Sequence, residues 1–554
     1  MKYTLLTPWQ RFLGLIKLEK KDVYQLFYYA IFGGIVSLSL PLGIQAIINL
    51  IQGAQISTSW IVLVILVTVG VLFSGILQLM QLRIIETLQQ RIFVRSSFEM
   101  SYRFPKIKMT ELRDYYPPEL ANRFFDTLII QKGLSKILID VPSALLQIIF
   151  ALILLSFYHP FFIVFGVLLL LLIYIVFKFT AQKGLETSLI ESKNKYKVAH
   201  WIQEIARAVV SFKLSGDTSL AMNKNDKLVD KYLNARENHF KILILQYSQM
   251  IGFKVLVTAS LLFIGGALVL NQEMNIGQFV AAEIIILLVI NSVEKLIVGL
   301  ESFYDTLTSI EKIGQVVDKD LEPQTGDKPI FNGNFSIHLD KVGYKVKDRS
   351  KAILKDISLK LNSKSRLLIK GESGSGKSTL LNMFAAVIQP TNGNIYVNNL
   401  SLSSINLNHY RAQLGLSLSN ESPFEGTIRE NLAFGNPKIE DHEMINILKI
   451  VGLEQYIKEQ PSGLDTGLHP EGKKISYSLS KKIILARAIL KKPKVIFLED
   501  ALDRFNNQET KQIIDYLTNP MQPWSLIVVS NNEAWEKQCT EIITIEKGKI
   551  INKK

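Results

Sequence analysis

The sequence of 554 residues contains a single cysteine, Cys539. One thiol cannot form an intrachain disulfide or supply paired thiolate ligands, so a disulfide framework and a cysteine-based metal site are both excluded. No cleavable signal peptide is expected either, because the first apolar run follows the basic patch at residues 17–21 and is too long for a signal core. Internal repeats and low-complexity tracts are also missing. The length predicts two or three domains.

The composition favours a membrane protein. Hydrophobic residues make up 48% of the chain, and the mean hydropathy is +0.21. The formal net charge of +14 fits either nucleic-acid binding or basic loops beside anionic lipid. Apolar spans and basic runs alternate along the chain, which favours a lipid bilayer as the partner and predicts no nucleic acid.

Six apolar segments are long enough to cross a bilayer, which takes about 20 residues. A polar and basic stretch at residues 1–22 precedes them and predicts an interfacial lead-in helix. Glu283 falls within the last segment, where it either lines a pathway or lies at helix-end depth and contacts solvent; both interpretations stay open. The predicted spans are residues 23–51, 60–82, 137–158, 161–177, 251–270 and 276–297.

The connections between the spans predict the orientation. Those at residues 52–57, 159–160 and 271–275 contain no Lys or Arg, whereas the long connections after the second and fourth spans are rich in both. By the positive-inside rule, the short connections are outside, and the long ones and both termini are cytoplasmic. We therefore expect a multi-pass protein of the plasma or inner membrane. Residues 82–103 and 184–209 are helix formers at amphipathic spacing, so the membrane helices are expected to continue into the cytoplasm.

The pattern changes after residue 320. Residues 321–334, rich in Pro and Gly, predict a linker, and from residue 335 short apolar runs alternate with helix-like segments. This alternation predicts an α/β domain with a largely parallel sheet. The expected strands are residues 335–338, 366–369, 494–498, 525–529 and 542–545.

A phosphate-binding loop follows the strand at residues 366–369 and precedes a helical segment. Glycines let the backbone wrap phosphates, and the helix N-terminus offers free N–H groups and a positive dipole end. Lys377 is expected to reach the outer phosphates of a nucleotide, and the Ser378 hydroxyl to ligate Mg²⁺. The loop, which fits G-x-x-x-x-G-K-[ST], consists of Gly371, Glu372, Ser373, Gly374, Ser375, Gly376, Lys377, Ser378 and Thr379.

Six spans with helical extensions followed by this loop resemble the ABC transporter family, in its type I exporter branch. Residues 426–431 and 486–488 also look like stretches of the nucleotide-binding domains of that family. The resemblance implies a transmembrane exporter domain at residues 23–320 and an ABC nucleotide-binding domain at residues 335–554. It further implies a dimer with a second half-transporter, in which ATP lies between the phosphate loop of one domain and the signature segment of the other.

Several positions depart from the family pattern. The aromatic residue that stacks on adenine falls at Val346, although Tyr344, two residues earlier, either substitutes for it or is an ordinary core aromatic. The glutamine that senses Mg²⁺ and the attacking water falls at Ser419. The signature segment at residues 475–479 keeps Ser476 but has lost both glycines, and those glycines allow a helix N-terminus close to the opposite γ-phosphate.

The acidic pair after the strand at residues 494–498 is in reverse order, Glu499 then Asp500. Glu499 can still ligate or orient Mg²⁺. Asp500 stands at the general-base position but is one methylene short, and a misplacement of about 1 Å can cost roughly a hundredfold in rate. The switch histidine falls at Asn531, which cannot transfer a proton. The aspartate that follows in the family falls at Asn506.

These departures predict an ATP-binding exporter subunit with weak or absent hydrolysis, moving an unidentified substrate out of the cytoplasm. ATP and Mg²⁺ are the implied cofactors, and whether the dimer is homo- or heteromeric stays open. One alternative is an active homodimeric exporter that tolerates the substitutions. The other is an ATP-sensing membrane scaffold that does not transport.

Overall fold

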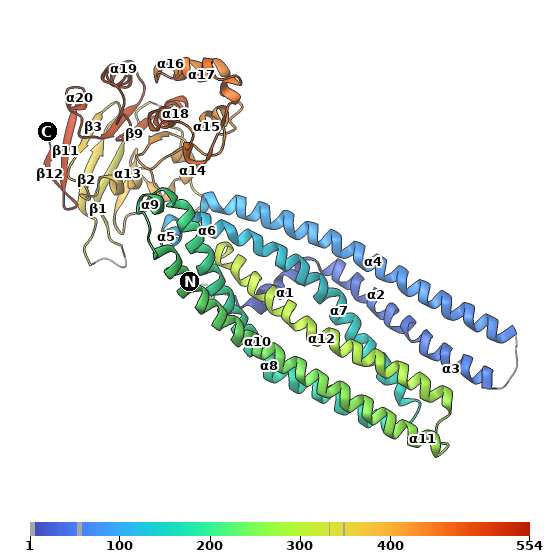
Figure 1. Ribbon diagram of the computed structural model, residues 1–554. Helices are drawn as coiled ribbons and strands as arrows, with labels where there is room; N and C mark the ends of the chain where they lie inside the picture. Colours follow the sequence, from blue (N-terminus) through green and yellow to red (C-terminus); the bar gives the residue numbers. More distant parts are fainter. Residues whose placement is uncertain (1–5, 53–57, 332, 347–349, 554) are drawn as a thin grey trace. The chain divides into compact units, whose positions relative to one another are not determined.

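The computed structural model describes residues 6–52, 58–331, 333–346 and 350–553 (Figure 1). The chain divides into two compact units: residues 1–107 with 112–320, here called the helical unit, and residues 108–111 with 321–554, called the α/β unit. All but the first residue of the connection predicted at 52–57 lies outside the described residues, as does position 332 of the predicted linker.

The helical unit contains short helices at its start and at its chain reversals, and long helices between them. A one-turn π-helix, Leu261–Gly265, joins α10 to α11. The first twelve α-helices of the chain are α1 (Pro8–Leu18), α2 (Lys20–Ser37), α3 (Ser39–Gln52), α4 (Thr58–Arg103), α5 (Met109–Leu112), α6 (Pro117–Ala121), α7 (Asp126–Ser156), α8 (Phe161–Arg207), α9 (Val209–Leu214), α10 (Leu220–Ser260), α11 (Gly266–Leu270) and α12 (Ile276–Val317). All belong to the helical unit except α5, whose first three residues belong to the α/β unit.

The six predicted spans are confirmed as helices long and apolar enough to cross a membrane. The first consists of α2 and α3, which are separated only by Leu38, three residues before Pro41. The predicted continuations are confirmed too, because α4 has 46 residues and α8 has 47. At 1.5 Å per residue each is about 70 Å long, more than twice the thickness of a bilayer core.

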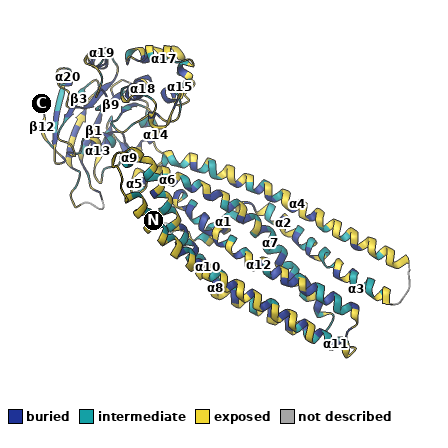
Figure 2. Cartoon of the chain, in the orientation of Figure 1, coloured by how far each residue is buried: buried dark blue, intermediate teal, exposed yellow. Residues whose placement is uncertain are grey.

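The core of the helical unit is organised around α12, which packs along α7 and also contacts α3, α8 and α1. Figure 1 shows α8 and α10 running side by side, and α2 lies against α4 and α7. α12 is the most buried of the six spans and α4 the least. In Figure 2 the outer faces of the long helices are exposed, and on α4 these faces carry apolar side chains such as Leu66, Leu72 and Leu79. Such faces suit contact with lipid.

Two ion pairs tie distant parts of the helical unit together. Lys254 on α10 pairs with Glu294 on α12, so the carboxylate of Glu294 in the predicted sixth span has a partner from the predicted fifth span. Arg11 on the lead-in helix α1 donates to Asp318, just past the end of α12, with Nη1 2.7 Å from Oδ1. Glu283 is half-buried and makes no ion pair within the described part of the chain, so its role stays open.

The α/β unit contains a six-stranded sheet, a four-stranded sheet and a two-stranded ribbon. The six-stranded sheet has the order β12-β11-β3-β10-β9-β6, and its strands are parallel except for β12. The largely parallel sheet is therefore confirmed. The strands are β1 (Ile337–Tyr344), β2 (Leu354–Leu361), β3 (Arg366–Lys370), β4 (Asn392–Val397), β5 (Leu400–Ser401), β6 (Leu414–Ser417), β7 (Gly426–Thr427), β8 (Gly467–Leu468), β9 (Val495–Glu499), β10 (Ser525–Val529), β11 (Glu541–Glu546) and β12 (Lys549–Lys553).

The four-stranded antiparallel sheet, β2-β1-β4-β5, was not expected from the sequence. The strand predicted at residues 335–338 is wrong in its bounds, since β1 runs from Ile337 to Tyr344. Its continuation reads Leu339-Asp340-Lys341-Val342, and Lys341 lies in the left-handed region with φ 48°. The register shifts against both neighbouring strands at this point, so the irregularity hid the strand.

Both faces of the parallel sheet are covered. Because successive side chains of a strand point to opposite faces, Phe497 packs toward α13 and the antiparallel sheet, whereas Ile496 and Leu498 pack toward α18. Strands buried on both faces are typical of parallel sheets. The helices are α13 (Lys377–Phe384), α14 (Leu407–Arg411), α15 (Ile428–Ala433), α16 (Asp441–Ile450), α17 (Glu454–Glu459), α18 (Tyr477–Leu490), α19 (Asn507–Leu517) and α20 (Glu533–Glu536).

Candidate functional site

The predicted phosphate loop connects β3 to α13, so it leaves the carboxyl edge of the parallel sheet and enters a helix N-terminus. Two of its glycines are required by geometry. Gly371 has φ 149°, and a Cβ there would lie 2.3 Å from the Ile545 carbonyl oxygen; Gly376 has φ 108°, and its Cβ would lie 2.8 Å from Leu354. Both positions therefore exclude other residues.

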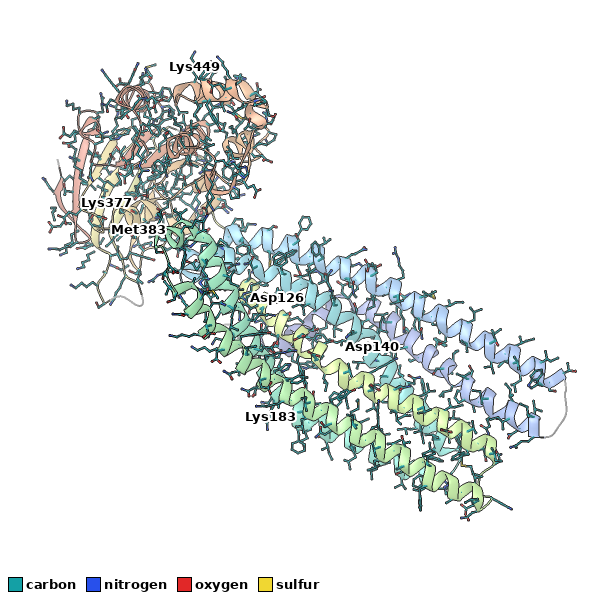
Figure 3. The ribbon with its side chains drawn as sticks, viewed as in Figure 1. Asp126, Asp140, Lys183, Lys377, Met383 and Lys449 are labelled. Carbon is teal, nitrogen blue, oxygen red and sulfur yellow. The ribbon has the colours of Figure 1, made fainter. Side chains whose placement is uncertain are left out.

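Lys377 is the first residue of α13 and is labelled in Figure 3. Its Nζ donates to the carbonyl oxygens of Gly371, at 2.7 Å, and Glu372, at 2.8 Å. The ammonium is thus held over the loop that it follows in sequence, where a phosphate would be positioned by both the charge and the helix N-terminus.

A cavity of about 390 Å³ opens beside this loop. It brings together residues that are more than 150 positions apart in the sequence, from the loop, from the end of β6 and from the ends of β9 and β10. Gly371, Glu372 and Ser375 belong to the loop but do not line the cavity. The lining residues are Ile353, Ser373, Gly374, Gly376, Lys377, Ser378, Thr379, Ser419, Glu499, Asp500, Val529, Ser530 and Asn531.

Glu499 is the last residue of β9 and is almost fully buried, with 5% of its surface exposed. Ser419 donates to its Oε2 twice, from the hydroxyl at 2.9 Å and from the backbone N–H at 3.3 Å. A buried carboxylate needs such donors. The Ser419 hydroxyl, which stands at the position expected to sense Mg²⁺, therefore donates to the Glu499 carboxylate.

Asp500 follows directly, in a left-handed conformation with φ 47° that aspartate tolerates better than most residues. Its backbone N–H donates to the Val529 carbonyl oxygen on the adjacent strand, at 3.0 Å. Burial, and then the negative charges of Asp503 and Glu499, raise the pKa of Asp500 above its ordinary value, while Lys377 and Lys481 oppose the shift. The raised pKa makes Asp500 a better proton acceptor than an exposed aspartate.

Lys481 is a site residue that the sequence analysis missed. It lies on α18 and is 2% exposed, and burial lowers its pKa. Its Nζ donates to the carbonyl oxygens of Leu418 at 2.9 Å, Ser419 at 2.6 Å and Glu421 at 3.1 Å. Lys481 thereby fixes the segment that presents Ser419 to the cavity. The available signal was its place next to Lys482 at the start of an otherwise apolar helix.

Tyr344 does not line the cavity. It ends β1, is half-buried and packs against the hydrophobic cluster between the two sheets. Val346 is buried as well, with 6% exposed. The apolar side chain that lines the cavity is Ile353, so this arrangement favours the interpretation of Tyr344 as an ordinary core aromatic.

Ser476 lies apart from the cavity and is the N-cap of α18, where its hydroxyl accepts from the Leu479 N–H at 3.2 Å. Tyr477, which stands in place of a signature glycine, is exposed, and the guanidinium of Arg504 lies 4.8 Å from its ring centroid. Asn506 likewise caps a helix, accepting from the Glu509 N–H at 2.7 Å. Tyr477 is thus the first residue of α18, at a position where the family resemblance predicts glycine.

Two family models match the chain, and together they cover both units. Residues 25–293 match the ABC transporter transmembrane region, and residues 354–503 match the ABC transporter model of the ATP-binding domain. A solved structure of a bacterial Atm1-family ABC exporter with ATP bound superposes with a TM-score of 0.84, covering 96% of this chain and 95% of that chain at 17% identity. At this identity the likeness shows the fold.

Curated relatives are similar over part of their length. An export ATP-binding/permease protein of Rickettsia typhi is 26% identical over 328 residues, which are 59% of this chain and 57% of the relative. The Toxin RTX-I translocation ATP-binding protein of Actinobacillus pleuropneumoniae is 25% identical over 353 residues, 63% of this chain and 50% of the relative. The chain thus spans between half and two thirds of the length of these relatives.

Proposed function

Since the chain belongs to the ABC transporter family, with the transmembrane region and the ATP-binding domain of that family in one polypeptide, we propose that it is one half of a dimeric exporter that binds ATP and hydrolyses it slowly. The names of the relatives describe export and toxin translocation, and the proposal extends export to this chain.

One observation carries this proposal. The intact phosphate loop and the replaced residues Ser419, Asp500 and Asn531 line the same cavity. The replacements therefore act where the γ-phosphate and the attacking water would lie, and they leave the phosphate-binding wall unchanged. Changes placed elsewhere in the domain would not separate binding from hydrolysis in this way.

Binding of ATP is assigned to the loop wall. Backbone N–H groups of the loop and of the first turn of α13 would hold the phosphates, with Lys377 on the outer ones. The described residues contain no group of three or more His, Cys, Asp or Glu that holds a metal on its own. Mg²⁺ needs no such group, because it typically takes one or two protein oxygens together with nucleotide phosphates. Ser378 and Glu499 line the cavity and fit that need.

Slow hydrolysis is assigned to the opposite wall. The Asp500 carboxylate has a raised pKa, which suits a base, but its side chain is one methylene shorter than that of glutamate. A water positioned by the loop wall would then lie out of reach, at a cost of roughly a hundredfold per ångström. Asn531 offers an amide in place of a proton-transferring imidazole, and the Ser419 hydroxyl already donates to Glu499.

The orientation and the partner are also part of the proposal. The charge distribution of the connections supports cytoplasmic termini and a cytoplasmic α/β unit in the plasma or inner membrane. The partner is a second half-transporter, either identical or different. Tyr477 at the signature position would weaken the nucleotide site that it shares with the phosphate loop of the partner, whether the dimer is homo- or heteromeric. We therefore expect a partner whose own nucleotide site tolerates this tyrosine.

The experiment uses the full chain in lipid nanodiscs. Fluorescence of trinitrophenyl-ATP with Mg²⁺ measures nucleotide binding, and phosphate release measures turnover. We expect saturable binding, and turnover that is near background and unchanged by Asp500→Asn. Absence of saturable binding would overturn the proposal.

The two alternatives predict other results. An active homodimer would release phosphate at a rate that falls at least about tenfold in Asp500→Asn. A scaffold that only senses ATP would show no ATP-dependent change in the helical unit. Spin labels at the exposed Leu270 of each protomer, introduced in a Cys539→Ser background, would report that change as an altered distance distribution.

A further inference from the structure

A second cavity, of about 160 Å³, lies within the helical unit between α2, α4, α7 and α12. Its lining is unusual for a membrane segment, because most of the side chains are polar. No carboxylate is among them. The lining residues are Tyr29, Ala30, Gly33, Gly34, Ser37, Ser74, Leu77, Gln78, Gln81, Ser143, Gln147 and Lys295.

Lys295 supplies the charge of this cavity. Glu294, the preceding residue, points away and pairs with Lys254 on α10, as expected for neighbours that lie about 100° apart around a helix. Lys295 makes no ion pair in the part of the chain that the structure describes. Asp140, which is labelled in Figure 3, lies on α7 three residues before Ser143 and makes no ion pair with Lys295. Lys295 is exposed, so its ammonium is free to pair with an anionic group that enters the cavity from the cytoplasmic side.

Several of the remaining polar groups can donate into the cavity, whereas Ser37 and Gln81 already donate to the carbonyl oxygens of Gly34, at 2.7 Å, and Leu26, at 3.5 Å. Ser292 donates to Oε1 of Gln147 at 2.9 Å, which leaves the amide nitrogen of Gln147 to donate into the cavity. The hydroxyls of Ser74 and Ser143 line the cavity as well. Donors around one ammonium, with no competing carboxylate, suit an anion with several acceptor oxygens.

The cavity has the depth that substrate loading requires. Lys295 lies 19 residues beyond the start of α12 at Ile276, about 28 Å along the helix, and so near the predicted cytoplasmic face of a core about 30 Å thick. Ser143 and Ser74 lie roughly 9 and 12 Å inside the same face, measured from the predicted ends of their spans at residues 137 and 82. The site extends from the cytoplasmic boundary toward the middle of the membrane.

One wall is shaped by glycine. A Cβ added to Gly33 would meet nothing within 4 Å, whereas one added to Gly34 would lie 3.0 Å from the ring of Phe150. Gly33 thus leaves open space in the cavity, and Gly34 lets α2 approach α7 closely. A larger side chain at Gly33 would occupy the space without disturbing the packing of the helices.

We propose that this cavity binds the anionic group, a carboxylate or a phosphate, of the transported molecule, with Lys295 as its counter-ion. The inference rests on the proposed export function and names the chemical class of its substrate. The cavity holds one charged group together with its neighbouring atoms, and the rest of the molecule would lie outside it.

The test measures equilibrium binding to the full chain in nanodiscs of neutral lipid. Two matched probe pairs are used. The first is a hexapeptide with neutral side chains, a neutral BODIPY label on its N-terminus and a free or an amidated C-terminus. The second is dihexanoyl phosphatidic acid against zwitterionic dihexanoyl phosphatidylcholine, and these lipids are followed by displacement of the labelled peptide or by thermal shift. We expect at least one anionic probe to bind about tenfold or more tightly than its matched counterpart. The pair that shows the preference identifies the source as a carboxylate or a phosphate.

Variants locate the preference. Lys295→Gln is expected to abolish it and Lys295→Arg to keep it. The control Lys178→Gln removes an exposed charge from α8, outside the cavity, and should leave the preference intact. Gly33→Val is expected to weaken the anionic probe about tenfold by filling the cavity, whereas Gly75→Val, at an exposed position of α4 with nothing within 4 Å, should not.

Equal binding of charged and uncharged probes, binding of neither pair, or an unchanged preference in Lys295→Gln would each overturn the inference. Trinitrophenyl-ATP binding is measured on the same samples. If ATP binding is retained and the charge preference is missing, this inference fails and the proposed function stands. If the preference is retained and ATP binding is missing, the proposed function fails instead.

Discussion

On one wall of the nucleotide cavity, the loop between β3 and α13 keeps every residue that phosphate binding needs. On the opposite wall lie Ser419, Asp500 and Asn531, at the positions where the family resemblance predicts a glutamine, a glutamate and a histidine. The loop wall is fixed by backbone geometry, as Gly371 and Gly376 show. The opposite wall is fixed by side chains, through Lys481 and the contact between Ser419 and Glu499. Under the proposed function, binding and hydrolysis therefore depend on different elements and can change separately.

The largest expected effect comes from the loop wall. Lys377→Ala removes a cation from the position of the outer phosphates, and charge-assisted hydrogen bonds are worth about 1.5–3 kcal/mol each. We expect trinitrophenyl-ATP to bind roughly a hundredfold more weakly. The control is Lys360→Ala on the exposed face of β2. Equal affinity in both variants would break the comparison, because the loop wall would then not be the binding wall.

The support of the opposite wall is tested by Lys481→Met, which keeps the size of the side chain but leaves three carbonyl oxygens without their donor. Unsatisfied buried groups cost about 1–3 kcal/mol each, partly relieved by relaxation, so the apparent Tm of the α/β unit should fall by roughly 5 °C. Thermal unfolding monitored in nanodiscs measures it. Lys511→Met on the exposed surface of α19 is the control, and an equal Tm in the two variants would contradict the role of Lys481.

A smaller change in free energy is expected when the predicted catalytic side chains are restored on the opposite wall. Asp500→Glu extends the carboxylate by one methylene toward the water position, and we expect phosphate release to rise about tenfold, with a further rise in the double variant with Asn531→His. Asp503→Glu makes the same extension outside the cavity lining and serves as control. If neither variant gains activity while ATP still binds, the block lies at Tyr477 and not in this wall.

The smallest effect concerns the charge of Asp500. Its pKa is raised in the folded state, so the ionised carboxylate destabilises the fold once the pH is above that pKa, and protonation relieves the strain as the pH falls. Because the group is partly exposed, the effect is modest. Asp500→Asn should raise the apparent Tm by about 1–2 °C at pH 7.5, and less at pH 5. A gain that is independent of pH, or one equal to that of the exposed control Asp515→Asn, would contradict this assignment.

The sequence predicted features whose pattern is local. Each span is continuous in the sequence, and the loop at residues 371–379 lies between its strand and helix, so length, hydropathy and spacing were sufficient. The largely parallel sheet followed from short apolar runs, such as residues 494–498, that alternate with helix-like segments. The antiparallel sheet was missed because β1 alternates imperfectly and is interrupted at Lys341.

Features that depend on packing between distant segments could not be predicted. The Lys254–Glu294 pair joins residues 40 positions apart, and the cavity at Lys295 is formed by four helices. Lys295 was contained in the predicted sixth span, but only the packed structure shows which face of α12 it occupies. The contacts of Lys481 with the 418–421 segment are of the same kind, because they join a helix to a loop about 60 residues earlier.

The pairing of Arg11 with Asp318 brings the two ends of the helical unit together. Adjacent termini are the condition under which a domain tolerates circular permutation. A short linker from Asp320 back to the start of α1, with new termini opened in the polar turn at residues 271–275, would give a closed helical unit without its attached ATP-binding domain. Such a circularly permuted variant would show whether the helical unit folds without the α/β unit.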